Sequence, residues 1–435
     1  GQQTSAEVKN MLEDLHAADI AEIMQELTMD EAQYLYLQLD GELASDVLVE
    51  IPEDDRNRFL KILSPDVIAS QFIEYMDSDD AADVIGDLDE EMKEAVLREI
   101  GDKEQAGDIA DLLGYDEDTA GGLMAKELVK VNENWSVQTC LKEISIQAEE
   151  IDEIYYVYVV DDDNILKGIL SLSKLIQKPT HTKVIDMITE EVHSARTDTS
   201  QEEVAQIMEK YDMVALPVVD HMGRLKGRIT IDDVVDVIRE EAGRDYQMVS
   251  GITGDVEPGD KIWQQTRARV PWLVIGTVGG LIGARVLGAN AGTISQIPAM
   301  AFFIPLIAAT AGNVGVQSSS IVVQNIASGS RSFDSIWEKL LKELAVGIVT
   351  ALFFSLIIFV YNYLFSNNIQ LTMAVSCTLF VVIIFASMSG TIIPLLLNSM
   401  KIDPALATGP FITTTNDILG LLLYMLVARA FLGIV

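Results

Sequence analysis

The stretch "LAVGIVTALFFSLIIFVYNYLF", residues 344–365, decides what kind of protein this is, because no charged side chain interrupts it. About 20 apolar residues in a helix span the hydrocarbon core of a bilayer. The segment 371–397 forms a second charge-free run, which is longer still. Both runs predict spanning helices, so the fold must include a membrane domain.

Three further segments have the length and composition of spans, although they are more polar. They are residues 271–287, 297–327 and 405–432. The first of them includes Arg285, and the last carries Asp417 at its midpoint. Lys and Arg lie before the first span, after the second and between the fourth and fifth. The positive-inside rule therefore predicts a cytoplasmic N-terminal half and a C-terminus outside the cell membrane.

The formal charge of −37 is divided very unevenly along the chain. Residues 261–435 hold 9 Lys/Arg and 5 Asp/Glu, which leaves 21 basic and 62 acidic residues for residues 1–260. Such an acidic half argues against nucleic acid as a partner and favours cations. Two lone cysteines, Cys140 and Cys377, predict no disulfide framework and a reducing, cytoplasmic environment for the soluble half.

Residues 10–115 have apolar side chains at three- and four-residue spacing, which predicts helices throughout. Short echoes such as "AADIAEIMQEL" and "DAADVIGDL" place aspartates at positions 19, 46, 83 and 108. A small α-solenoid or an irregular helical bundle would both fit this loose period.

Residues 125–242 contain a duplication. "VYVVDDDNILKGILSLSKL" from Val157 aligns with "LPVVDHMGRLKGRITIDDV" from Leu216, and in each copy an apolar strand ends in Asp161 or Asp220. The pattern predicts a repeated β-α-β-β-α unit, which resembles a pair of CBS modules. Neither copy has a P-loop or a G-x-G-x-x-G phosphate cradle.

In that order the segments resemble the MgtE family of magnesium channels. The resemblance is carried by "YDEDTAGGLM" (115–124), "AGNVGVQSS" (311–319) and "DPALATGPFITTTNDILGLLLYMLVAR" (403–429). It implies a multidomain membrane protein with an N-terminal α-solenoid, tandem CBS modules, a connecting helix and five transmembrane helices. The corresponding ranges are 1–124, 125–243, 244–266 and 267–435.

The resemblance also implies a homodimer whose second and fifth helices line a pore, which cytosolic Mg²⁺ closes by binding between the soluble domains and the connecting helix. ATP at the CBS pair is a further expectation from it. Two departures stand out. Met222 stands where the family often has a carboxylate, and Asn416 replaces a more usual Ser or Thr.

Asp417 is the residue most expected to bind the ion, because a mid-bilayer charge is costly and usually faces a water-filled path. In a dimer, two copies of Asp417 would form an acidic ring for hydrated Mg²⁺. One turn earlier, the Thr413 carbonyl stands where the family uses a backbone oxygen. The pore-lining candidates are Asn313, Gln317 and Asn416. Interhelical hydrogen bonding is the alternative role for Asn313 and Gln317, whereas Asn416 is expected to hold water around the ion.

Further metal ligands are expected at the cytoplasmic side. Asp403 either stabilises the start of the last helix or, as in the family, joins an ion site at the inner mouth of the pore. The regulatory candidates either match the family or lie on connecting segments, and the helical-domain ligands cannot be placed from sequence. These candidates are Asp220, Asp232, Asp255, Glu257 and Asp260.

The sequence thus predicts a Mg²⁺-selective channel and not an enzyme, since no catalytic motif lies in the spans. The alternative is a secondary transporter that couples a divalent metal to Na⁺ or H⁺. Such a protein normally shows inverted repeats or a second mid-span ionisable group. Neither is apparent in the sequence.

Overall fold

The computed structural model separates into two compact units, residues 1–239 and 240–435. The residues whose structure it describes are 8–9, 11–12, 15–61, 63–148, 151, 153–188, 192–254, 256, 259–327, 335–366, 368–407 and 409–432.

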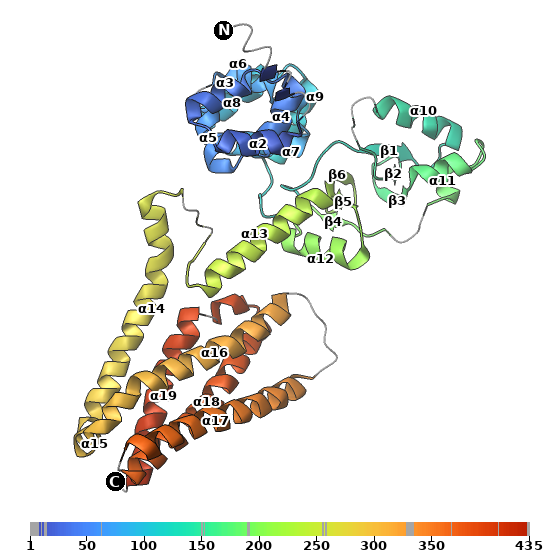
Figure 1. The fold of residues 1–435 in the computed structure, drawn as a ribbon. Helices are drawn as coiled ribbons and strands as arrows, with labels where there is room; N and C mark the ends of the chain where they lie inside the picture. Colours follow the sequence, from blue (N-terminus) through green and yellow to red (C-terminus); the bar gives the residue numbers. More distant parts are fainter. Residues whose placement is uncertain are drawn as a thin grey trace. The chain divides into compact units, whose positions relative to one another are not determined.

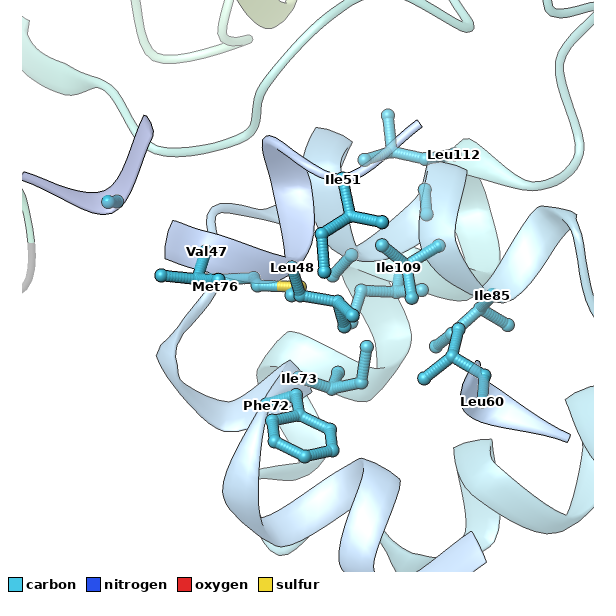
Figure 2. Packing of buried hydrophobic residues seen from close by; sticks show 14 of the residues in the cluster. Val47, Leu48, Ile51, Leu60, Phe72, Ile73, Met76, Ile85, Ile109 and Leu112 are labelled. Carbon is cyan, nitrogen blue, oxygen red and sulfur yellow. The ribbon is translucent and has the colours of Figure 1, made fainter. Parts of the chain in front are cut away.

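The first unit begins with an all-helical domain (Figure 1), as the spacing of apolar residues predicts. Asp89 and Asp102 cap two of its helices by accepting hydrogen bonds from first-turn backbone amides. Figure 2 shows how Leu48, Ile73 and Ile109 meet in one fully buried core. The helices are α2 (Ala17–Gln25), α3 (Met29–Tyr36), α4 (Gly41–Val49), α5 (Glu53–Leu60), α6 (Pro65–Gln71), η1 (Ile73–Tyr75), α7 (Ser78–Gly86), α8 (Glu90–Glu99) and α9 (Lys103–Leu112).

Two three-stranded sheets follow, and they confirm the repeated β-α-β-β-α unit. In each sheet the first strand pairs in parallel and the last antiparallel with the middle strand. The register shifts at Val159/Val160 in one copy and at Val218/Val219 in the other, which are equivalent positions. The elements are β1 (Val129–Asn132), α10 (Val137–Gln147), β2 (Val157–Val160), β3 (Leu166–Leu170), α11 (Leu172–Gln177), η2 (Val184–Asp186), β4 (Ala195–Arg196), α12 (Gln201–Tyr211), β5 (Ala215–Val219), β6 (Leu225–Thr230) and α13 (Ile231–Val249).

The second unit contains five helices long and apolar enough to cross a membrane, which confirms the predicted number of spans among the described residues. Mean hydropathy over their most apolar windows ranges from 1.5 to 2.6. The fourth, α18, is the most buried and packs against α16, α17 and α19. The elements are α14 (Ile262–Ala289), α15 (Ala291–Gln296), η3 (Pro298–Phe303), α16 (Ile304–Ala327), α17 (Ile336–Phe365), α18 (Ile369–Ser399), η4 (Pro404–Ala407) and α19 (Gly409–Leu432).

The connecting segment differs from the single helix expected over residues 244–266. Helix α13 runs from the second CBS module to Val249, and α14 begins only at Ile262. Gly251 ends α13 because it adopts a left-handed φ of 78°, and Ile252 N donates to Gln247 O at 2.9 Å in a Schellman-type cap. Gly254, with φ 87°, turns the chain again before α14.

Candidate functional site

Asp417 lies half-buried on α19, one turn after the half-buried Thr413. Helix α16 approaches both residues at Gly312. A Cβ at Gly312 would lie 3.0 Å from Thr413 Cγ2 and 3.6 Å from Asp417 Oδ1. The tight contact is the one with Thr413, where a side chain on α16 would crowd α19, and the two predicted pore helices meet beside the predicted ion-binding residue.

Asn313 and Gln317 are exposed on α16 in this single chain. They lie four residues apart, so they share one face of the helix. Ser320 and Gln324 continue the same face at helical spacing, and Gln324 is also exposed. Sequence reasoning missed these two, although the recurrence of polar residues at positions 313, 317, 320 and 324 was available as a signal.

Asn416 has a different environment from the other pore-lining candidates, because its side chain is completely buried within the chain. Ser389 Oγ donates to Asn416 Oδ1 at 2.8 Å, and Asn416 Nδ2 donates to Ala311 O at 3.4 Å. The side chain also lies against Gly315 of α16. In this arrangement Asn416 joins α19 to α16 and α18, an interhelical role that the sequence did not suggest for it.

Asp403 lies just before η4 and is exposed, and its Oδ1 accepts a 2.8 Å hydrogen bond from Ala405 N. Asp403 therefore caps η4, and not the start of the last helix α19 as the sequence suggested. Burial, followed by the charge of Asp403, raises the pKa of Asp245 on α13. A second carboxylate therefore approaches Asp403, and nothing in the local sequence around Asp245 indicated it.

The end of α13 also contacts the start of α19. Gly409 has a left-handed φ of 51°, and a Cβ there would overlap Val249 O. A Cβ at Gly251 would lie 2.6 Å from Pro410 Cγ. Trp272 Nε1 of α14 donates to Thr253 Oγ1 at 2.8 Å. The chain between α13 and α14 is thus packed against the first turn of the helix that carries Asp417.

The regulatory candidates are dispersed. Asp220 uses Oδ1 to accept from Met222 N and Arg224 N at 2.8 and 2.9 Å, and these backbone hydrogen bonds, that of Arg224 above all, lower its pKa. Asp161 accepts the equivalent bonds in the first repeat. Asp232 is exposed and Asp260 is half-buried. Asp255 and Glu257 lie outside the described residues.

The structure adds an acidic cluster between the helical domain and the CBS pair, within the first unit. Oxygen atoms of Asp77, Asp79 and Glu127 lie within 4.8 Å of one another. Glu127 Oε2 also accepts a 2.8 Å hydrogen bond from Ser78 Oγ, which fixes its position at the start of α7. Carboxylate oxygens are the ligands that Mg²⁺ and Ca²⁺ prefer.

Neighbouring carboxylates extend this cluster and add to its electrostatic repulsion. Burial and then the charge of Asp233 raise the pKa of Asp79 well above its usual value and that of Asp80 to about 7. Burial raises the pKa of Asp83 to about 7 and also raises that of Asp233. A divalent cation would relieve this repulsion, so the donor set fits a metal centre.

Asp233, not its exposed neighbour Asp232, is the α13 residue that faces this cluster. Its Oδ2 accepts from Thr230 N and Thr230 Oγ1 at 3.1 and 2.6 Å. Helix α7 ends at Gly86, so only the tertiary fold brings it together with Asp233. We call Asp77, Asp79, Asp80, Asp83, Glu127 and Asp233 the α7 cluster.

The fold defines a multi-pass membrane protein in which an acidic helical domain and a repeated β-α-β-β-α module precede five apolar helices. The chain belongs to the MgtE family. The family profile described as "Divalent cation transporter" matches residues 304–427, the "MgtE intracellular N domain" matches residues 15–118, and CBS domains match residues 120–180 and 184–240.

Full-length relatives support this assignment. The chain is 32% identical to the magnesium transporter MgtE of Bacillus subtilis over 94% of this chain and 99% of that protein. It is 33% identical to MgtE of Thermus thermophilus over 95% of each chain. The fold also resembles the crystal structure of the cytosolic domain of the Mg²⁺ channel MgtE in complex with ATP, with a TM-score of 0.50 and 35% identity over 53% of this chain and 93% of that one.

Proposed function

We propose that this protein is a homodimeric, Mg²⁺-selective channel that imports Mg²⁺ across the cell membrane and closes when cytosolic Mg²⁺ binds to its soluble domains. The observation that carries the proposal is the position of Asp417 and Thr413 on α19, directly against Gly312 of α16. The names of the full-length relatives supply the transported ion.

The ion path lies along the face of α16 and α19 that a second copy of the chain covers. Asn313 and Gln317 leave exposed amide groups on a membrane helix, where lipid would offer them no hydrogen bonds. Covering this face with the same face of a second copy gives them water or polar partners. Two copies of Asp417 then face one axis and attract hydrated Mg²⁺.

The α7 cluster is the proposed sensor. At low Mg²⁺ its carboxylates repel one another, which favours separation of the helical domain from the CBS pair. Bound Mg²⁺ removes this repulsion and favours the compact arrangement. The packing of Val249 and Gly251 against Gly409 and Pro410 gives the soluble domains a mechanical route to α19.

Asp403, with Asp245 near it, is proposed to join an ion site at the inner mouth of the pore. The proposed ligands of regulatory ions still include Asp220, Asp232, Asp255, Glu257 and Asp260. The CBS pair is proposed to bind ATP, because the related cytosolic domain was crystallised with this nucleotide. The soluble domains face the cytoplasm and the C-terminus faces outside, as the distribution of Lys and Arg predicts.

An ion-coupled transporter is the second candidate, and one observation favours it. Such a protein is expected to have a second ionisable group within its spans, and Glu343 of α17 is bound by serines of α16 and α18. The sequence did not suggest this group, because Glu343 directly precedes the charge-free run. Dependence of Mg²⁺ flux on a Na⁺ or H⁺ gradient would establish coupling.

Uptake of Mg²⁺ into liposomes that contain the Asp417→Asn variant tests the proposal. The substitution keeps the size of the side chain and removes up to two negative charges from the dimer axis. Uptake should be lost, while thermal stability in detergent stays the same or rises, because charge within a membrane is costly. A folded variant that carries Mg²⁺ at the parental rate would refute the role of Asp417.

A further inference from the structure

Glu343 is a carboxylate on α17 whose partners lie well inside neighbouring spans. Ser318 Oγ of α16 donates to Glu343 Oε1 at 2.6 Å, and Ser387 Oγ of α18 donates to the same oxygen. Both serines are buried, whereas Glu343 is half-buried. Three helices therefore bring their polar groups together at one carboxylate.

The surrounding glycines show that this contact is part of the helix packing. A Cβ at Gly347 would lie 3.1 Å from Ser387 Oγ, and a Cβ at Gly390 would overlap Gly315 O and lie 3.0 Å from Ser318 Cβ. The helices are close here because these positions have no side chains. Glycine at these positions brings the two serines within reach of Glu343.

The two hydroxyl groups solvate the carboxylate in the way that water would, because both act as donors to it. Among the described ion pairs, none joins Glu343 to a Lys or Arg. The hydrogen bonds that the structure gives this carboxylate come from the two serine hydroxyl groups. A charge held in this way acts on its surroundings over a longer distance than an ion pair does.

The polar face of α16, which is proposed to line the ion path, lies next to Ser318 around the helix. Ser318 directly follows Gln317, which belongs to the exposed polar face of that helix. The diameter of a helix with its side chains is about 10 Å, and this sets the scale of separation between Glu343 and an ion on that face. At such a distance in a protein interior, a unit charge still interacts appreciably with a divalent ion.

We infer that Glu343 supplies a second fixed negative charge to the ion path, located behind α16 and nearer the cytoplasmic end than Asp417. This inference rests on the proposed function, since it requires the polar face of α16 to line the path. Glu343 does not touch the ion. It is a positioning and selectivity residue that raises the concentration of divalent cations in the inner half of the pore.

The test is Glu343→Gln in the full-length protein, reconstituted in planar bilayers or liposomes. Glutamine retains a carbonyl oxygen that accepts from both serines, so packing is preserved while the charge is lost. Glu338→Gln is the matched control, because Glu338 lies five residues earlier on α17, is exposed, and caps the helix through Ser335, a role that glutamine also performs.

Loss of the charge should raise the half-saturating Mg²⁺ concentration roughly tenfold. This is the effect of the Coulomb energy between a unit charge and a divalent ion about 10 Å apart, for a dielectric constant between those of protein and water. Because this energy is proportional to ionic charge, the corresponding change for Na⁺ in divalent-free solution should be only about threefold. A purely structural role would change both ions alike or lower the melting temperature. Glu338→Gln should leave both values unchanged.

Parental half-saturation for Mg²⁺ in Glu343→Gln would overturn the inference, as would equal effects on Mg²⁺ and Na⁺. If the glutamine variant fails to fold, Glu343 is a packing residue and the inference is wrong. Asp417→Asn separates the two proposals. If that variant is inactive while Glu343→Gln is parental, only the second charge is refuted. If Asp417→Asn conducts normally, the proposed ion path itself fails.

Discussion

Replacing Asp80 by asparagine should make the soluble half resistant to protease without Mg²⁺. In the compact arrangement, burial and the charges of Asp233, Asp83 and Asp77 raise the pKa of Asp80 from 3.8 to about 7. A shift of this size corresponds to about 4 kcal/mol of unfavourable free energy for the ionised form. Asparagine carries no charge, so the variant avoids this cost.

The size of this term is sufficient to matter for a conformational switch. About 5.5 kcal/mol converts a 1:99 equilibrium into 99:1. We take the energy from Asp80 alone, because neighbouring carboxylates that titrate together do not contribute additively. We therefore expect the half-time of proteolysis in EDTA to lengthen at least roughly tenfold in Asp80→Asn. A change of this size uses only part of the free energy that the charge of Asp80 costs the compact state.

The pH dependence follows from the same shift. Because the pKa of Asp80 in the compact state is higher than its ordinary value, the compact state becomes more stable as the pH falls from about 7 toward 4. Protease resistance without Mg²⁺ should therefore be greater at pH 6 than at pH 8. Added Mg²⁺ should increase resistance more at pH 8, where the carboxylates are ionised and free to bind it.

The assay is limited proteolysis of the full-length protein in detergent, with Mg²⁺ or with NaCl at matched ionic strength. Asp66→Asn is the control, because Asp66 is an exposed acid on α6 that lies outside the α7 cluster. Equal resistance of Asp80→Asn and Asp66→Asn in EDTA would refute the reasoning, as would a Mg²⁺ effect of the same size at both pH values.

Three other predictions concern the membrane unit. Gly312→Ala should abolish most transport because its Cβ meets α19, whereas Gly276→Ala of α14, whose Cβ meets nothing within 4 Å, should be near parental in liposome uptake. Asn416→Ala should lower thermal stability by about 1–3 kcal/mol, because it leaves buried partners without hydrogen bonds; an unchanged melting temperature would contradict this. Gly409→Ala should displace Val249 and leave a channel that stays open in high Mg²⁺, and normal closure would refute the proposed mechanical route.

The fold was largely predictable because its signals are local. The charge-free runs need only their length to be recognised as spans, and the CBS repeat is visible as two stretches that align with each other. The course of the connecting segment was not predictable in detail. Its polar, charged composition is compatible with a continuous helix, and residues 243, 251 and 254 are all glycines, of which Gly251 is the one that ends α13.

A site residue was predictable only where its side chain is of an unusual type for the segment in which it lies. Asp417 is conspicuous because it is the one acid in an apolar span. Asp233 is not, because the soluble half holds 62 acidic residues and its position beside α7 depends on contacts between distant segments. The burial of Asn416 likewise depends on which face of α19 packs against α16 and α18, and a single span does not encode this.

Single-channel recording with asymmetric Mg²⁺ tests the central claim most directly. With Na⁺ and pH equal on both sides, the parental protein should give unitary currents that reverse near the Mg²⁺ equilibrium potential, and Asp417→Asn should give none. Mg²⁺ movement that yields no unitary current and requires a Na⁺ or H⁺ gradient would contradict a channel. Parental currents in Asp417→Asn would contradict the assignment of this carboxylate to the ion path.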